Sequence, residues 1–344
     1  MSPQATATSL YREAAQAGDI VRQQLAANGA LLQSLGVRLR ALLPRAVVTC
    51  ARGSSDHAAT FAKYLIETRL GVVTASAAPS VSSLYEASPQ VRDMVLLAIS
   101  QSGASPDLLA AAASARAAGS LVVALINAQS SPLARAADVA VPLLAGMERS
   151  VAATKSYIAS IAAVIQLVAT WAQDQQLLEE LRGAPAALER AWQHDWGAAL
   201  PRLVDADHLF VIARGLGLGV AQEAALKLKE TCGLHAEALS AAELRHGPMA
   251  LLRRGFPVLV FAQNDETLDS VTALAREIAS RGADVMIAGA NVPSTLSLPS
   301  ESAPAVIQPM LLIQSFYRLA NALALARGRD PDHPPHLRKV TETV

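Results

Sequence analysis

The sequence contains two copies of one strand–turn–helix unit, and this repeat constrains the fold more than any other feature. The tripeptide Ala-Arg-Gly occurs at 51–53 and again at 213–215, each time directly after an apolar run, at 46–50 and 209–213. Short runs rich in β-branched residues are typical of buried parallel strands. Further strands are predicted at 94–99, 121–126, 138–144, 257–262 and 284–288. We therefore expect an α/β fold with two doubly wound, flavodoxin-like lobes, each a parallel sheet flanked by helices.

The repeat and the chain length together set the expected domain limits. A chain of 344 residues is too long for one comfortable core. Gly, Pro and Trp interrupt the pattern between 183 and 201, which predicts the junction of the lobes there. We expect a helical segment, a first lobe, a second lobe and a proline-stiffened, extended tail that closes the active site, at 1–44, 45–182, 195–328 and 329–344.

Composition excludes several classes of protein. Acidic and basic residues balance at 29 each, which argues against a nucleic-acid surface. Cys50 and Cys232 have no partners at metal-ligand spacing, so we expect no disulfide framework and no metal site. The N-terminus lacks a signal-peptide pattern. The stretch 156–173 carries no charge, but its scattered Ser, Thr and Gln residues favour a buried helix over a membrane span. These features predict a cytoplasmic protein without membrane or nucleic-acid partners.

The loop 100–105, Ser-Gln-Ser-Gly-Ala-Ser, follows a predicted strand and precedes a predicted helix. Ligands of open parallel sheets bind at the carboxyl ends of strands. Ser105 is expected as the N-cap and Pro106 as the first helical residue, so free N–H groups there suit a phosphate. A capped turn with solvated serines is the alternative. A second turn with hydroxyl side chains, at 53–55, should open on the same sheet edge. The second copy of the repeat has Gln-Asn-Asp-Glu at 263–266 in place of the serine loop.

Three charged residues, Glu223, Lys227 and Glu230, lie at i, i+4 and i+7 on an otherwise apolar helix. They form either a surface ion pair worth a few tenths of a kcal/mol or a carboxylate held by a lysine in a cleft. The nearby Gly-rich turn does not complete the dinucleotide-binding motif. His246 precedes Gly-Pro, which exposes it on a sharp turn, and Lys339 lies in the tail, where a solvated lysine is the ordinary case.

These motifs resemble the sugar isomerase (SIS) family, and specifically the isomerase half of glucosamine-6-phosphate synthase and the stand-alone glucosamine-6-phosphate deaminases. The resemblance covers essentially the whole chain. The resemblance is found in six segments: RGSSDHA, SQSGASPD, SVAATKSY, EAALKLKE, LHAEALSAAELRHGPMALL and DPDHPPHLRKVTETV.

The resemblance implies a role for each matching residue. The phosphate loop corresponds to Ser100, Gln101, Ser102 and Ser105. Ser55 matches a serine near the sugar, and Glu223 and Lys227 match supporting polar residues. Glu230 matches the carboxylate that moves a proton between sugar C1 and C2. His246 matches a histidine that assists ring opening across a homodimer interface, and Lys339 matches a tail lysine that can form a Schiff base with a ketose.

The chain also departs from the synthase. It begins Met1-Ser2 and runs straight into the sugar-binding unit, Ala-Ser-Pro-Asp replaces a Glu-Thr pair after Ser-Gln-Ser-Gly, and Ala153 and Pro335 replace a serine and an arginine. The leading expectation is an isomerising deaminase that converts glucosamine 6-phosphate and water to fructose 6-phosphate and ammonia, as a homodimer without a cofactor. The alternatives are a deglycase or isomerase acting on another amino sugar phosphate, and a non-catalytic phosphosugar sensor.

Overall fold

The computed structural model describes residues 3–339 and divides the chain into two compact lobes. The first lobe comprises Asp19–Glu148, Lys155–Gly183 and the segment that begins at Arg338. The second lobe comprises Ala184–Leu337, Arg149–Thr154 and the chain up to Gly18. Residues 340–344 of the expected tail lie outside the described residues, and its described part, 329–339, forms neither helix nor strand.

The first lobe is built on a five-stranded parallel sheet with the order β2-β1-β3-β4-β5. Its strands are β1 (Val47–Cys50), β2 (Thr74–Ser76), β3 (Val95–Ser100), β4 (Leu121–Ile126) and β5 (Val139–Pro142). The chain leaves β1 toward β2 on one side and then continues with β3 on the other. The strand order therefore reverses between β1 and β3, which is where open α/β sheets bind ligands.

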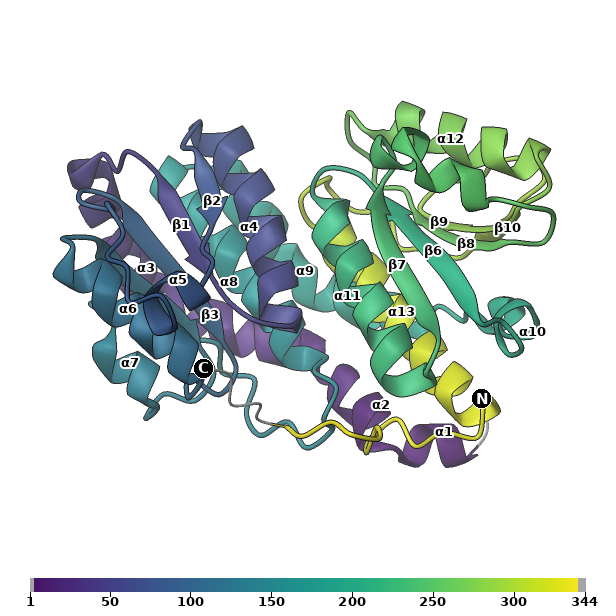
Figure 1. The fold of residues 1–344 in the computed structure, drawn as a ribbon, viewed down its shortest axis with the longest axis horizontal. Helices are drawn as coiled ribbons and strands as arrows, with labels where there is room; N and C mark the ends of the chain where they lie inside the picture. The colour runs from purple at the N-terminus through teal and green to yellow at the C-terminus, as the bar shows by residue number, and fades with distance from the viewer. Residues whose placement is uncertain (1–2, 340–344) are drawn as a thin grey trace. The chain divides into compact units, whose positions relative to one another are not determined.

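Helices cover both faces of this sheet (Figure 1). Leu96, Val122 and their neighbours pack against Leu108 and Ala112 of α6 (Pro106–Ala117). On the other face, α4 (Ser54–Leu70) packs against α8 (Lys155–Ala172). The remaining helices with residues in this lobe are α3 (Ala17–Leu42), α5 (Ser80–Ser83), α7 (Pro132–Ala136) and α9 (Gln175–Gln193).

The uncharged stretch predicted to be a buried helix is α8. Within the described residues it is the one helix long and apolar enough to cross a membrane, but 89% of its apolar window is buried inside the protein. Gly183 and Pro185, expected to interrupt the pattern, lie inside α9 instead. Neither residue ends the helix, although Pro185 lacks an N–H to donate to the preceding turn.

The second lobe repeats the topology of the first. Its parallel strands are β6 (His208–Ala213), β7 (His235–Ser240), β8 (Pro257–Phe261), β9 (Asp284–Ala288) and β10 (Leu296–Leu298), in the order β10-β9-β8-β6-β7. When β6 is numbered as strand 1, the strand order read from the β7 edge is 2-1-3-4-5, the same as in the first lobe. The α/β fold class with two doubly wound lobes is thus confirmed, and the strand order supports the repeat inferred from Ala-Arg-Gly.

In the second lobe, α12 (Leu268–Ser280) covers one sheet face, and α11 (Gly217–Cys232), packed on α13 (Gln308–Ala326), covers the other (Figure 1). The short helices of this lobe are α1 (Pro3–Ala7), α2 (Ser9–Ala14), η1 (Gly197–Ala199), α10 (Leu200–Leu203), η2 (Glu243–His246) and η3 (Pro248–Leu251). The charged residues of α11 therefore lie on the face of the sheet that α11 and α13 cover.

Three strands were not predicted: β2, β7 and β10. Each lies at an edge of its sheet and has only one buried residue. In β7, for example, His235 and Glu237 are exposed while Ala236 is buried. Such strands lack the continuous apolar run by which the inner strands were recognised.

Candidate active site

Two serine-bearing turns meet at the reversal of strand order in the first lobe. Cys50 of β1 pairs with Ala98 of β3 in parallel register, so the carboxyl ends of both strands lie at the same edge of the sheet. Gly53 follows β1 with a φ of +55°, and α4 begins at Ser54, which places Ser54 and Ser55 in its first turn. The sequence predicted this edge as a ligand site, and the observed topology puts the switch point there.

The loop after β3 is folded tightly by its own hydroxyl groups. Ser100 is buried, and its Oγ accepts a hydrogen bond of 3.0 Å from the backbone N–H of Gly103. Ser102 Oγ accepts from the N–H of Ala104 at 3.4 Å. Gly103 has a φ of +61°, and a Cβ there would lie 2.2 Å from Ser131 Oγ. Only glycine fits this position without displacing its neighbours.

The loop leads directly into the N-terminus of α6. Ser105 occupies the N-cap position and Pro106 the first turn, as predicted, but the Ser105 side chain makes no capping hydrogen bond. Its hydroxyl group is therefore available to a ligand, and the positive end of the dipole of this 12-residue helix lies beside it. The free N–H groups expected from the sequence are fewer, because Pro106 has no N–H and the N–H of Leu108 donates to Asp107 Oδ1 at 2.8 Å. Gln101, Ser102 and Ser105 are all partly exposed. The arrangement suits a phosphate group.

An ion pair that sequence reasoning missed joins the two turns. Arg52 Nε donates to Asp107 Oδ2 at 2.8 Å, and a second guanidinium nitrogen lies 2.7 Å from the same oxygen. Asp107 is fully buried in the first turn of α6, while the Arg52 side chain is half exposed. Arg52 belongs to the repeated Ala-Arg-Gly, and Asp107 to Ser-Pro-Asp, so both were visible in the sequence without their pairing. The pair fixes the turn after β1 against the start of α6.

The equivalent edge of the second lobe is filled by a side chain. Gln263, which follows β8, is 1% exposed, and its Nε2 donates to the carbonyl oxygen of Arg214 at 2.8 Å. Its Oε1 occupies the space beside Gly217, because a Cβ on that glycine would lie 2.1 Å away. Of the two related edges, the one in the first lobe therefore carries the features of an anion site.

Helix α11 of the second lobe holds a buried lysine between two carboxylates. Lys227 is 1% exposed, and its Nζ lies 3.5 Å from Glu223 Oε1 and 2.5 Å from Glu230 Oε2. Glu223 is fully buried, and the hydroxyl of Tyr317 on α13 donates to it at 3.4 Å. The Glu230 side chain is 21% exposed. Glu230 is thus the member of this triad that a ligand can reach, and the surface-pair alternative is excluded by the burial of the other two.

The two remaining predicted residues lie in separate lobes. His246 ends η2, immediately before Gly247, whose φ is +138°, and is exposed on the expected sharp turn. Lys339 belongs to the first lobe, where its Nζ lies 3.2 Å from Glu148 Oε2. It is not the solvated tail lysine of the ordinary case.

The family model described as "SIS domain" matches residues 44–170 and 202–300, which covers a large part of both lobes. The chain belongs to the SIS family. The first matched segment lies in the first lobe except for Arg149–Thr154, and the second lies in the second lobe.

Relatives of this SIS protein include sugar-phosphate enzymes. It is 37% identical over 316 residues to glutamine–fructose-6-phosphate aminotransferase [isomerizing] of Aeropyrum pernix, covering 85% of this chain and 50% of that protein. The corresponding protein of Legionella pneumophila (strain Lens) is 34% identical over 312 residues, with the same coverage. The chain therefore spans about half the length of the curated relatives it matches.

Solved structures agree with the fold. A proposed phosphosugar isomerase from Silicibacter pomeroyi DSS-3 is 40% identical, with a TM-score of 0.91 and coverage of 94% of this chain and 100% of that chain. The C-terminal domain of glucosamine-fructose-6-phosphate aminotransferase from Francisella tularensis is 25% identical, with a TM-score of 0.85 and coverage of 97% and 100%. A glucosamine-6-phosphate deaminase from Thermotoga maritima, at 22% identity and a TM-score of 0.77, shares the fold.

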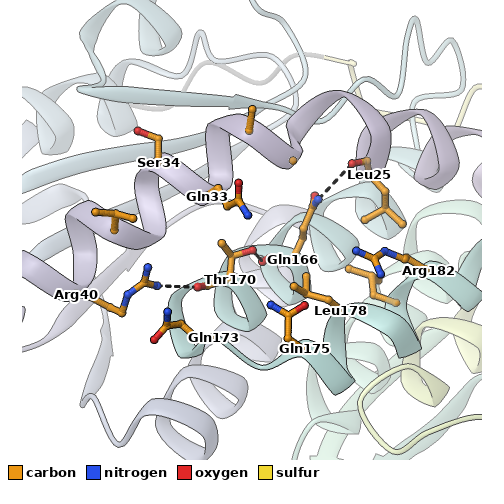
Figure 2. A pocket seen from close by; sticks show the side chains of 14 residues that line it. Leu25, Gln33, Ser34, Arg40, Gln166, Thr170, Gln173, Gln175, Leu178 and Arg182 are labelled. Atoms are coloured by element: carbon orange, nitrogen blue, oxygen red, sulfur yellow. Dashed lines mark hydrogen bonds between the residues drawn. The ribbon is translucent and has the colours of Figure 1, made fainter.

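A separate cavity of about 650 Å³ lies in the first SIS lobe among α3, α8 and α9, and no predicted site residue lines it (Figure 2). Its polar groups already serve the helices. Arg40 donates to the carbonyl oxygens of Thr170 and Trp171 at the end of α8, and Gln166 Nε2 donates to that of Leu25. Arg40 thus caps the C-terminus of α8, and the predicted site residues lie elsewhere, at the serine-bearing sheet edge, on α11, in η2 and in the tail.

Cys50 and Cys232 are both buried and form no disulfide bond. Burial is the main factor that raises the pKa of the Cys50 thiol to about 12 and that of Cys232 to about 11, so both stay protonated. Among residues 3–339, no group of three or more His, Cys, Asp or Glu residues could hold a metal ion.

Proposed function

We propose that this chain is an isomerising deaminase, which converts glucosamine 6-phosphate and water to fructose 6-phosphate and ammonia. The assignment of the chain as a phosphosugar isomerase-type SIS protein rests on the family match and on the relatives. The deaminase reading adds the resemblance of the Ser-Gly-Ala-Ser-Pro-Asp sequence to stand-alone deaminases. The names of its relatives, aminotransferase [isomerizing] and phosphosugar isomerase, fit a substrate with a 6-phosphate and a C1–C2 proton transfer.

The observation that supports this proposal best is the Glu223–Lys227–Glu230 triad. A buried ammonium flanked by two carboxylates neutralises part of their charge and fixes the Glu230 side chain on a rigid helix. A general base needs this kind of fixed position within reach of the proton that it removes. With Glu230 partly exposed, its free oxygen is the one that a sugar can approach.

The proposed reaction assigns one step to each residue. The serine turns hold the phosphate through Ser100, Gln101, Ser102 and Ser105, with Ser55 toward the sugar. His246, contributed in a homodimer by the partner subunit, promotes opening of the ring. Glu230 then removes the proton from C2 of the open-chain amino sugar and returns it to C1. The product is a C2 imine, which water hydrolyses to the ketose and ammonia.

The test compares two single carboxylate-to-amide changes. Glu230→Gln keeps size and hydrogen bonding but cannot accept a proton, so ammonia release should fall about 10²–10⁴-fold with phosphosugar affinity retained. Glu237→Gln is the matched control, since Glu237 is an exposed glutamate of the same lobe, and it should leave turnover within about twofold. Near-normal turnover of Glu230→Gln would show that another carboxylate moves the proton.

The substrate and the catalytic role are tested on the wild-type protein. Ammonia and fructose 6-phosphate should appear together from glucosamine 6-phosphate. Turnover of a fructosyl-amino-acid phosphate without activity on glucosamine 6-phosphate would favour a deglycase. Tight phosphosugar binding without turnover of any of these compounds would favour a sensor.

A further inference from the structure

Glu148 is a buried carboxylate to which sequence reasoning assigned no role. Its side chain has no exposed surface. Oε1 accepts a hydrogen bond of 3.3 Å from the backbone N–H of Ser156, and Oε2 accepts one of 2.7 Å from the Ser156 hydroxyl. The ammonium of Lys339 donates to the same Oε2 at 3.2 Å, and the Lys339 side chain is 25% exposed.

The two partners of this ion pair differ in how firmly they are held. Glu148 is bound to the first turn of α8, an 18-residue helix whose N–H groups and dipole stabilise a negative charge. Lys339 lies on a segment without helix or strand and has a flexible four-carbon side chain. Glu148 is thus a fixed point, and Lys339 is the partner whose position depends on it.

We propose that Glu148 is the positioning residue for Lys339, which it holds in place and from which it takes the proton when the amine attacks a ketose. The inference rests on the proposed function, because the ketose that Lys339 would attack, fructose 6-phosphate, is the product of that reaction. Burial makes the pairing necessary: a carboxylate with no exposed surface needs a cation and hydrogen-bond donors around it. In the proposed step, Glu148 Oε2, which lies 3.2 Å from the Lys339 ammonium, is the base that takes the proton.

The proton transfers of the step balance. Lys339 gives one proton to Glu148 and becomes a neutral amine, whose Nζ forms a bond to C2 of fructose 6-phosphate. A second proton moves from Nζ to the former carbonyl oxygen. Glu148 then returns its proton to that oxygen, the C2–O bond breaks, and one water leaves an iminium ion on Lys339. No oxidant, reductant or other reactant is needed.

The pairing itself is tested without sugar or turnover. Acetylation of Lys339 by acetic anhydride, mapped by mass spectrometry, should rise several-fold in Glu148→Gln. The matched control is Glu67→Gln in the same lobe, where Glu67 Oε1 accepts from the N–H of Thr74 at 2.9 Å, and it should leave Lys339 labelling unchanged. Ser156→Ala keeps the carboxylate and reports any effect of a loosened α8 N-terminus. Equal labelling of Glu148→Gln and wild type would overturn the proposal.

The role of Glu148 in the reaction is tested by measuring whether its effect depends on Lys339. Borohydride trapping of fructose 6-phosphate on Lys339 should be at least tenfold slower in Glu148→Gln, with affinity for inorganic phosphate within about twofold of wild type. In a Lys339→Met background the same change should alter ammonia release less than twofold, since residues that act as a unit are not additive. An equal loss of ammonia release in both backgrounds would show that Glu148 has only a structural role.

The two experiments separate the inference from the function on which it rests. If the wild-type protein released no ammonia and trapped no ketose, the proposed function and the proton-accepting part of the inference would both fail. The labelling result would still decide whether Glu148 positions Lys339. A wild type that turns over the amino sugar, combined with a Glu148→Gln variant that traps normally, would refute the inference alone.

Discussion

Gly103→Ala should destabilise the first lobe more than a matched glycine change that lacks its steric crowding. Gly103 and Gly71 have similar φ values, +61° and +66°, so alanine at either position costs about 1–2 kcal/mol for the left-handed conformation. Nothing lies within 4 Å of a Cβ on Gly71, whereas a Cβ on Gly103 would be 2.2 Å from Ser131 Oγ and 2.7 Å from Ile126 Cδ1. The difference between the two variants therefore measures the crowding.

The structure also sets the size of that difference. Ser131 Oγ caps α7 by accepting from the N–H of Ala134 at 3.3 Å, so a displaced Ser131 loses a cap worth about 1 kcal/mol. We expect Gly71→Ala to cost about 1–2 kcal/mol and Gly103→Ala about 1 kcal/mol more, before any displacement of Ile126. For a lobe of this size, each kcal/mol lowers the melting temperature by about 2–4 °C.

Thermal and urea unfolding of both variants, followed by circular dichroism, provide the assay. Inorganic phosphate binding, measured by calorimetry, should weaken in Gly103→Ala and stay unchanged in Gly71→Ala, because only the first change moves the serine loop. If Gly103→Ala were no less stable than Gly71→Ala and bound phosphate equally well, the loop would tolerate a side chain and the argument for its tight fold would be refuted.

Three further changes test other contacts of the candidate site. Ser102→Ala should raise KM for the phosphosugar more than it lowers kcat in steady-state assays, because phosphate binding is largely common to the ground and transition states. Asp107→Asn removes the charge that holds Arg52 and should cost about 1–3 kcal/mol in urea unfolding while weakening phosphate binding; unchanged affinity would show that the pair does not shape the loop. Tyr317→Phe removes the donor to Glu223 and should lower kcat up to about tenfold without changing the oligomeric state, and an unaltered kcat would exclude a supporting role for that hydroxyl.

The inner strands and the serine loop were predictable from the sequence, because their signals are local. Strands β4 and β9 begin and end at the predicted residues. Each is a short apolar run whose side chains are buried by the sheet and its helices, and turn residues end it. Ser105-Pro106 likewise marks the start of α6 through backbone chemistry that needs no distant partner.

The triad on α11 was only half predictable. The spacing of Glu223, Lys227 and Glu230 places them on one helix face in any fold. Which face is buried depends on α13, whose Tyr317 is 94 residues from Glu223 in the sequence. Periodicity therefore gave the alignment of the three charges, and packing decided which carboxylate is left partly exposed.

Only the tertiary structure decided the features that depend on distant or edge contacts. The edge strands β2, β7 and β10 carry too few buried residues to be recognised alone. The Gln263 side chain distinguishes the two related sheet edges because it lies over Gly217. Glu148 and Lys339 are 191 residues apart in the sequence. The free energy of such a pair depends on burial and geometry that no local pattern contains, so composition and spacing name the candidate residues while the folded chain chooses their partners.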